Sequence, residues 1–237
     1  MTPAFLELAV GTGDILDSLA FYRQLGFSEL ATSDAVDHAY AAVTDGAVAI
    51  GLHGVDEFVP ALRYVRANVR RFVLDAGDAG TDFDDVKLDD DHLHQASLDD
   101  PWGHRVTWVE ARTFSPPPAE TQPSQLGELL EITLPVDDLY RAARFWAPYS
   151  ERVAAERDEP AHLRLDTNGV AVGLSEERLV PGPALSYCVR DATTLQETLN
   201  RFDLPLAAGP LPGHAFARLN APEGTAFILW REDFVTA

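Results

Sequence analysis

The stretch Ala47-Val-Ala-Ile-Gly-Leu52 returns in the second half of the chain as Gly169-Val-Ala-Val-Gly-Leu174. Other short motifs recur in the same order around it, at an offset that drifts by only a few residues. The matched pairs are Leu6–Val10 with Ile132–Val136, Ser18–Tyr22 with Ala142–Trp146, Pro60–Tyr64 with Pro183–Tyr187, and Asp100–Gly103 with Ala221–Gly224. An internal repeat of this length predicts two copies of one structural domain.

A single linker-like stretch separates the copies. It reads Ser115-Pro-Pro-Pro-Ala-Glu-Thr-Gln-Pro-Ser-Gln125, and its prolines remove backbone donors and favour extended chain. We therefore predict a first domain over residues 1–114, a linker over 115–126 and a second domain over 127–237. A chain of 237 residues is long enough for two such domains.

Each copy has an inner order of elements. Phe5–Val10 is short, apolar and typical of a strand, and Asp14 then caps a helix that Gly26 ends. The apolar face of that helix follows helical spacing at Ile15, Leu19, Tyr22 and Leu25. Three strands are predicted next, at Phe27–Thr32, His38–Thr44 and Ala47–His53, with Asp45-Gly46 as the hairpin signal between the last two.

The same order then begins again within the first copy. The predicted elements are a strand at Ala61–Val65, a helix near Asn68–Ala76 and strands at Phe83–Leu88, Leu93–Leu98 and Arg105–Glu110. Because the second half repeats both units, the chain is predicted to be α+β, with four βαβββ units.

Two motifs carry a family resemblance. Residues 19–27 read Leu-Ala-Phe-Tyr-Arg-Gln-Leu-Gly-Phe, and residues 100–104 read Asp-Pro-Trp-Gly-His. With the paired units, they resemble the vicinal oxygen chelate superfamily of glyoxalase I, bleomycin-resistance proteins and type I extradiol dioxygenases. The resemblance implies two glyoxalase-like domains, each a curved sheet around a cavity that in many members holds a divalent metal. That metal chelates two neighbouring substrate oxygens.

The resemblance also implies where metal ligands would lie. Its enzymes place a His on the first strand, a His or similar residue on the first strand of the second unit, and a Glu on the last strand. Aligned by motif, the first half offers Phe5, Ala61 and Thr107, and the second half offers Glu131, Ala184 and Ile228. A two-residue slip would admit Glu7. Since only Glu131 is a competent ligand, we expect no metal cofactor; a divalent Fe, Mn, Ni or Zn ion is the alternative.

Glu131 is the candidate catalytic residue. Apolar neighbours would raise the pKa of its carboxyl group and suit it to acid–base work, unless it pairs with an arginine such as Arg164. Arg63 shares the strand parity of Ala61 and is a candidate to grip an anionic ligand. Aromatic residues are expected either to line the cavities or to form the core: Phe5, Tyr40, Tyr64, Trp108, Tyr187 and Trp230.

The remaining reactive residues are given structural interpretations. His92 and His94 form a polar loop or an adventitious metal site, and His104 is a turn residue or an acid–base group. Cys188 lies in an apolar strand and is interpreted as a buried small hydrophobe. No Gly-rich phosphate loop and no GxSxG motif is present.

Composition excludes some partners. Asp and Glu total 38 against 18 Lys and Arg, a formal charge of −20, which disfavours nucleic-acid and anionic-membrane binding. No apolar run reaches ~18 residues and no signal peptide is evident, so the expectation is a cytoplasmic protein, monomeric or homodimeric. The favoured function is the binding of a small organic molecule without the usual metal triad. The alternative is an enzyme: a metal-dependent lyase, isomerase or extradiol dioxygenase, or a metal-free enzyme that works through Glu131. A third possibility is that one half binds while the other is a degenerate packing copy, and Glu131 then makes the second half the better functional candidate.

Overall fold

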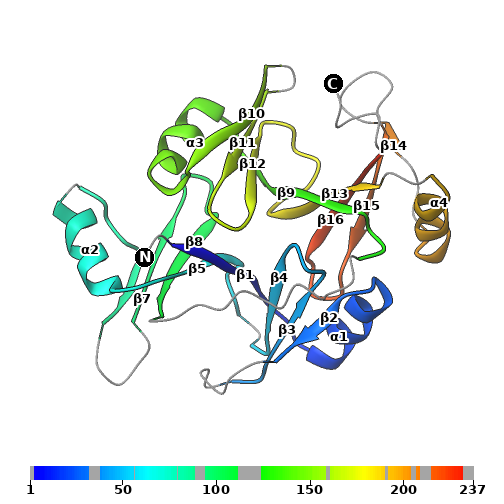
Figure 1. Cartoon of the computed structure of the whole chain (residues 1–237), viewed down its shortest axis with the longest axis horizontal. Coiled ribbons are helices and arrows are strands. Elements are labelled where there is room, and N and C mark those ends of the chain that lie inside the picture. Colours follow the sequence, from blue (N-terminus) through cyan, green and yellow to red (C-terminus); the bar gives the residue numbers. More distant parts are fainter. Residues whose placement is uncertain are drawn as a thin grey trace.

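The computed structural model contains two eight-stranded sheets built on one plan (Figure 1). It describes residues 3–31, 38–55, 57–78, 80–88, 94–111, 124–158, 161–189, 192–203, 207–208 and 215–231. The strand orders are β2-β3-β4-β1-β5-β8-β7-β6 and β10-β11-β12-β9-β13-β16-β15-β14. The predicted α+β fold of paired βαβββ units is confirmed. Residues 112–123 lie outside the described part, so the bounds of the linker stay a prediction.

The first domain consists of β1 to β8 with two helices, and the second of β9 to β16 with two more. The first contains β1 (Ala4–Gly11), α1 (Ile15–Gln24), β2 (Ser28–Leu30), β3 (Tyr40–Thr44), β4 (Ala49–His53), β5 (Ala61–Arg66), α2 (Val69–Asp78), β6 (Asp85–Lys87), β7 (Gln95–Asp99) and β8 (Arg105–Glu110). The second contains β9 (Glu128–Pro135), α3 (Leu139–Trp146), the 3-10 turn η1 (Ala147–Tyr149), β10 (Arg152–Asp158), β11 (Ala161–Asp166), β12 (Ala171–Ser175), β13 (Ala184–Val189), α4 (Ala192–Arg201), β14 (Ala207–Ala208), β15 (Ala215–Asn220) and β16 (Ala226–Arg231).

The predicted start and end of the first helix agree with the structure. The Asp14 carboxylate accepts hydrogen bonds from the backbone N–H groups of Leu16 and Asp17 and so caps α1. Gly26 follows the helix at φ +87°, a conformation that favours glycine. Strand β2 is shorter than predicted because Phe27 leaves the strand and packs on Tyr22, with 5.4 Å between ring centroids.

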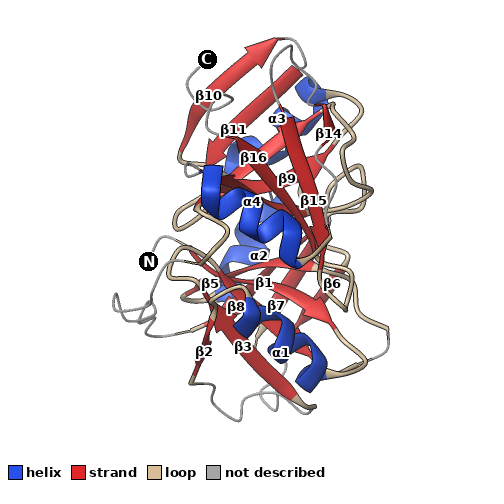
Figure 2. Cartoon of the chain, turned by 90° about the vertical axis from the view of Figure 1, so that its right-hand side faces the viewer, coloured by secondary structure: helices blue, strands red, loops and turns tan. Residues whose placement is uncertain are grey.

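One hydrophobic core joins the two domains. It is built from the helix-covered faces of both sheets, and Phe21 and Tyr22 of α1 lie against Phe227 of β16. On the other side of the molecule, Trp108 of β8 meets Tyr149 after α3. Each unit of one domain therefore packs beside the opposite unit of the other; the view in Figure 2 shows the second domain above the first.

Crossed hydrogen bonds reinforce this interface. The Tyr64 hydroxyl is 2.8 Å from the hydroxyl of Thr167 in the β11–β12 hairpin turn. Reciprocally, Tyr187 donates to the Asp45 carboxylate in the β3–β4 hairpin turn, at 2.7 Å. Burial raises the pKa of both tyrosines, and the Asp45 charge raises that of Tyr187 further. Each domain's hairpin is thus held by a central strand of the other domain.

Among the helices that the structure describes, none is both long and apolar enough to span a membrane.

Candidate functional site: two unequal cups

A β-bulge sets the position of the key carboxylate in each domain. The pairing of β1 with β5 shifts between Phe5 and Glu7, and that of β9 with β13 shifts at the corresponding place before Glu131. The bulge turns Glu7 and Glu131 onto the face of each sheet that lies away from the shared core. We call this face of β1–β8 the first cup and the same face of β9–β16 the second cup.

A glycine makes room for each carboxylate. A Cβ atom added at Gly51 would lie 2.2 Å from Glu7 Oε2, and one added at Gly173 would lie 2.0 Å from Glu131 Oε1. Both glycines occupy the fifth position of the repeated motif, which spans Ala47–Leu52 in the first half and Gly169–Leu174 in the second. The recurrence of that glycine is the signal that pairs Glu7 with Glu131.

In the first cup, Glu7 is the centre of a buried polar cluster. Its carboxylate accepts hydrogen bonds from Arg63 Nη1 at 2.7 Å and from the Tyr40 hydroxyl at 2.5 Å, and His53 Nε2 lies 3.5 Å away. Burial alone would raise the pKa of Glu7, but the bond with His53, the Arg63 charge and the Tyr40 hydroxyl together lower it. Glu7 is therefore an ionised anchor for Arg63.

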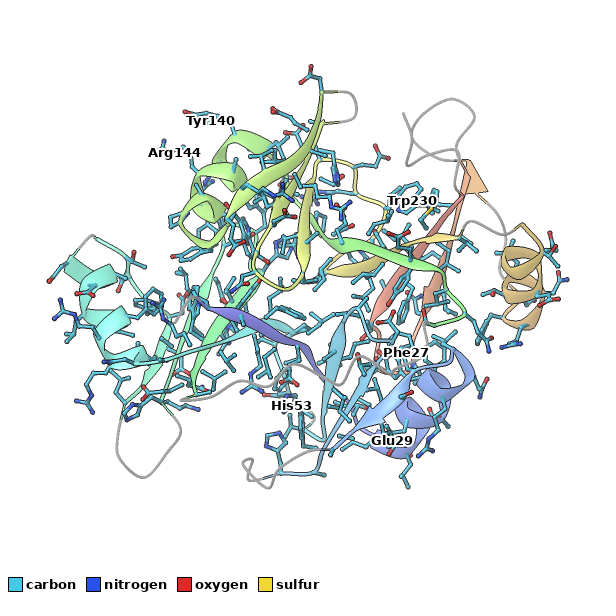
Figure 3. The ribbon with its side chains drawn as sticks, in the orientation of Figure 1. Phe27, Glu29, His53, Tyr140, Arg144 and Trp230 are labelled. Atoms are coloured by element: carbon cyan, nitrogen blue, oxygen red, sulfur yellow. The ribbon has the colours of Figure 1, made fainter. Side chains whose placement is uncertain are left out.

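His53 links this cluster to the rim of the cup. Its Nδ1 atom is 2.8 Å from His38 Nε2, and the Phe58 ring stacks on it at 4.6 Å between centroids and 14° between planes. Figure 3 labels His53 on the first domain. With one face stacked on Phe58 and both nitrogens close to polar partners, the ring is fixed in orientation.

The polar groups continue across the sheet on the far side of Arg63. Arg63 pairs in register with Thr107 of β8, whose hydroxyl is 2.9 Å from the Ser97 hydroxyl on β7. The Arg63 side chain keeps 15% of its surface exposed, and of its five N–H donors only Nη1 has a contact among the described residues. Its other donors are therefore not engaged by the described residues, and part of the side chain is open to solvent.

The second cup has fewer polar groups at the same positions. Glu131 accepts a hydrogen bond from the Thr133 hydroxyl at 2.9 Å and lies 3.1 Å from His162 Nε2; Thr133 in turn contacts Ser186 at 2.7 Å. The partner of Glu131 is thus His162 and not Arg164, whose buried Nε has no hydrogen-bond partner among the described residues.

Apolar side chains fill most of the rest of the second cup. They form a cluster separate from the shared core, and Figure 3 labels one of its members, Trp230. Its members are Val180, Ala184, Ala226, Ile228 and Trp230, with Leu130, Leu179 and Phe216 packed against them. Ala184 and Ile228, two of the predicted ligand positions, are therefore packing residues.

The predicted ligand alignment of the first half needs a two-residue correction. Phe5 lies on the opposite face, in the shared core, with its ring 5.6 Å from Tyr64, because the bulge separates its direction from that of Glu7. Ala61 shares the cup face but bears no functional group. In strand register, Glu7, Arg63 and Thr107 correspond to Glu131, Ser186 and Ile228.

The other aromatic candidates fall into two groups. Tyr64, Trp108 and Tyr187 belong to the shared core, whereas Tyr40 and Trp230 lie in the cups.

These residues do not fit a divalent metal. The first cup sets a guanidinium cation between Glu7 and Thr107, where an ion would have to sit, and the second offers one carboxylate, one hydroxyl and one isoleucine. In the described part of the chain, no three His, Cys, Asp or Glu side chains gather as a metal site. His92 lies outside the described residues; His94 contacts Glu110 at 3.1 Å.

Solved structures with the same architecture are known. A catechol 2,3-dioxygenase matches 98% of this chain and 93% of its own, at 14% identity and TM-score 0.58. The chain has the vicinal oxygen chelate fold. Homoprotocatechuate 2,3-dioxygenase from Arthrobacter globiformis (12% identity, 98% and 81% coverage, TM-score 0.63) shares this fold. So does the Mn(II)-bound glyoxalase from Novosphingobium aromaticivorans (14%, 97% and 82%, TM-score 0.57). No family model and no curated protein matches the sequence.

Sequence reasoning missed one further pair. His104 is buried, and its Nδ1 atom is 2.8 Å from the Asp100 carboxylate at the start of the same turn. The signal was present in the Asp-Pro-Trp-Gly-His motif, because an i, i+4 Asp and His across a tight turn can close on each other. The second half carries Ala221 and Thr225 at these two positions.

Proposed function

We propose that the first cup binds a small organic molecule through two adjacent oxygen atoms, and that the Arg63 guanidinium receives them in place of a metal ion. The single observation behind this proposal is that Arg63 stands on β5 between Glu7 and Thr107, 2.7 Å from the Glu7 carboxylate. A guanidinium offers parallel N–H donors in a planar fork, a geometry that matches two neighbouring oxygen acceptors.

The surrounding cluster would prepare Arg63 for this task. Glu7 holds Nη1, while Tyr40 and His53 hold Glu7, so the guanidinium is fixed before a ligand arrives. A fixed donor loses less conformational freedom on binding than a mobile one, which strengthens binding. The Thr107 hydroxyl stands beside Arg63 and can take a further polar contact.

The first cup suits this role better than the second. Ser186 is the register counterpart of Arg63 and carries no charge, and apolar side chains occupy the adjoining surface. Among the described residues, the two central strands β9 and β13 therefore bring no cation to the second cup; its arginines on this face, Arg164 and Arg218, lie further out, on β11 and β15.

The test compares two isomeric probes, catechol with adjacent hydroxyls and resorcinol with separated ones, by isothermal titration in the presence of EDTA. We expect catechol to bind at least tenfold more tightly. The Glu7→Gln/Arg63→Gln double variant, which avoids an unpaired buried charge, should weaken catechol binding by about 10- to 100-fold, the equivalent of one charge-assisted bidentate contact. Ser186→Ala is the matched control and should bind as wild type.

Equal binding of the two probes, or loss of catechol binding in Ser186→Ala alone, would overturn the proposal. Elemental analysis gives an independent check. One tightly held Fe, Mn, Ni or Zn ion per chain, absent from Glu7→Gln, would show that the cup is a metal site after all.

A second candidate function rests on the contact between Glu131 and His162. A buried carboxylate 3.1 Å from an imidazole nitrogen can hold or move a proton without a metal. In that case the chain would be an enzyme working through the second cup, and Glu131→Gln would abolish turnover while leaving catechol binding in the first cup intact.

A further inference from the structure

A cationic cavity lies on the seam between the two domains. It has a volume of about 370 Å³ and is bordered by Trp102 and His104 of the first domain and by Arg178, Pro181 and Arg218 of the second. It is distinct from both sets of polar residues around Glu7 and Glu131.

The orientation of His104 in this cavity is fixed by Asp100. The Asp100 side chain is fully buried; its Oδ1 accepts the backbone N–H groups of Trp102 and His104, and its Oδ2 contacts His104 Nδ1 at 2.8 Å. Nδ1 is therefore committed, whereas Nε2 forms no hydrogen bond with the described residues. A buried Asp fixes the ring so that Nε2 is the atom left to meet a ligand.

Two arginines stand opposite the histidine. Arg218 makes one 3.3 Å bond to the Leu179 carbonyl oxygen, which leaves most of its five donors for a ligand. Arg178 pairs with Asp137, but both side chains are more than 60% exposed, and a surface pair of this kind is weak enough for a ligand anion to displace. No Asp or Glu among the described residues lines this smaller cavity, although Glu223 lines the larger one beside it. In a chain of net charge −20, this is a locally positive site.

A larger and mostly apolar cavity adjoins it. Its volume is about 740 Å³, and it shares Pro181 and Arg218 with the smaller one. Leu8, Val10 and Phe58 are among its apolar lining residues. Thr12, Asn220, Glu223 and Thr225 add polar groups to this lining, and the Glu223 carboxylate is engaged by the Ser18 and Tyr22 hydroxyls. Volumes of this size at a domain interface are typical of small-molecule sites.

We propose that the seam is a second binding site, specific for an organic anion. Its carboxylate or sulfonate would lie among Arg178, Arg218 and His104, and its apolar body would occupy the larger cavity. The charge of the head and the apolar chamber beside it together select this class over neutral or fully polar molecules. The site goes beyond the proposed function, since none of Glu7, Arg63 and Thr107 lines either cavity.

The experiment titrates the protein with 2-naphthoate and 2-naphthol, which share a body and differ in charge, at about 0.05 M salt. We expect 2-naphthoate to bind at least tenfold more tightly. The Arg178→Gln/Arg218→Gln variant should lose that preference, and His104→Gln should weaken naphthoate binding about fivefold. Arg152→Gln is the control, because Arg152 is an exposed, ion-paired arginine of the same domain, remote from the cavity lining.

A second variant tests the apolar chamber without disturbing the fold. A Cβ atom added at Gly182, which lines the larger cavity, meets nothing within 4 Å, so Gly182→Phe should fold normally and weaken naphthoate binding about tenfold. Equal affinity for the two probes, or equal loss in Arg152→Gln, would overturn the proposal. So would loss of naphthoate binding in Glu7→Gln/Arg63→Gln with none in the seam variants, which would place the probe in the first cup.

Discussion

The two turns at 100–104 and 221–225 have the same backbone conformation, but their side chains make different contacts. In each, the first residue donates to the last residue's carbonyl and accepts from the glycine, all at 2.9 Å, and the glycine has positive φ. In the first turn, Asp100 and His104 close on each other beside a cationic cavity. In the second, Glu223 reaches across the domain interface. Its carboxylate accepts hydrogen bonds from Tyr22 at 2.6 Å and Ser18 at 2.9 Å, both on α1.

The helices that face these turns, α1 and α3, differ from each other in the same way as the turns do. Where α1 offers the hydroxyls of Ser18 and Tyr22 to Glu223, α3 has Ala142 and Trp146 at the matching repeat positions and sets Arg141 over the Trp102 ring at 5.8 Å. One side of the molecule is thus joined by a partly buried carboxylate, and the other by apolar and cation–π contacts. A repeated turn keeps its geometry through backbone bonds and a glycine, which leaves its side chains free to diverge.

Among the substitutions considered, removal of the Glu223 carboxylate from the second turn should cause the largest loss of stability. Glu223→Ala would remove the charged acceptor of both the Tyr22 and the Ser18 hydroxyls, so we expect the free energy of unfolding to fall by about 3 kcal/mol. Urea unfolding measures the change. Glu223→Gln, which keeps an acceptor oxygen, should cost about half as much. A loss below about 1 kcal/mol in Glu223→Ala would mean that this carboxylate does not hold the interface.

The glycines beneath the two carboxylates give the next largest effect. Gly173→Ala would bring a Cβ atom to 2.0 Å from Glu131 Oε1, and we expect a loss of about 2 kcal/mol from overpacking. Gly51→Ala should cost the same or more, because Tyr40 and Arg63 hold Glu7 from moving aside. Adding Glu131→Ala to Gly173→Ala should recover stability, since the clash disappears. A double variant less stable than the sum of its parts would contradict this explanation.

The crossed tyrosines should give the smallest effect at neutral pH. Tyr187→Phe removes a bond to a carboxylate and should cost about 1.5 kcal/mol, whereas Tyr64→Phe removes a hydroxyl pair and should cost about 0.5–1 kcal/mol. Urea unfolding at pH 7 distinguishes the two.

The same tyrosines predict how stability depends on alkaline pH. Their pKa values are raised in the folded protein, so their contribution is complete below the ordinary tyrosine pKa of 10.0 and is lost as pH rises above it, where the unfolded chain ionises first. Stability should therefore fall between pH 10 and 11.5, and Tyr187→Phe should make that fall shallower. An unchanged slope in the variant would show that Tyr187 ionises as easily in the folded state as in the unfolded one.

The sequence predicted the fold well because its signals are local and occur twice. The Asp14 cap, Gly26 and the repeated Val-Ala-Ile-Gly-Leu motif each act within a few residues, and repetition fixed their meaning. The cup residues were harder to place, because one extra residue in β1 turns Phe5 to the core and Glu7 to the cup, and a bulge leaves no composition signal. The cluster of Glu7 with Tyr40, Arg63 and His53 depends on pairing between distant strands, which no spacing in the sequence reports.

The crossed contacts of Tyr64 and Tyr187 have the form of an isologous interface, in which the same patch of two equal partners meets itself. In a symmetric dimer of identical chains, every substitution changes both of the equivalent contacts at once. A fused chain escapes this constraint, and one end can exchange a neutral hydroxyl for a carboxylate while the other stays as it was. Asp45 opposite Tyr187, with Thr167 opposite Tyr64, shows this freedom in use: the two ends of one repeated contact differ in charge.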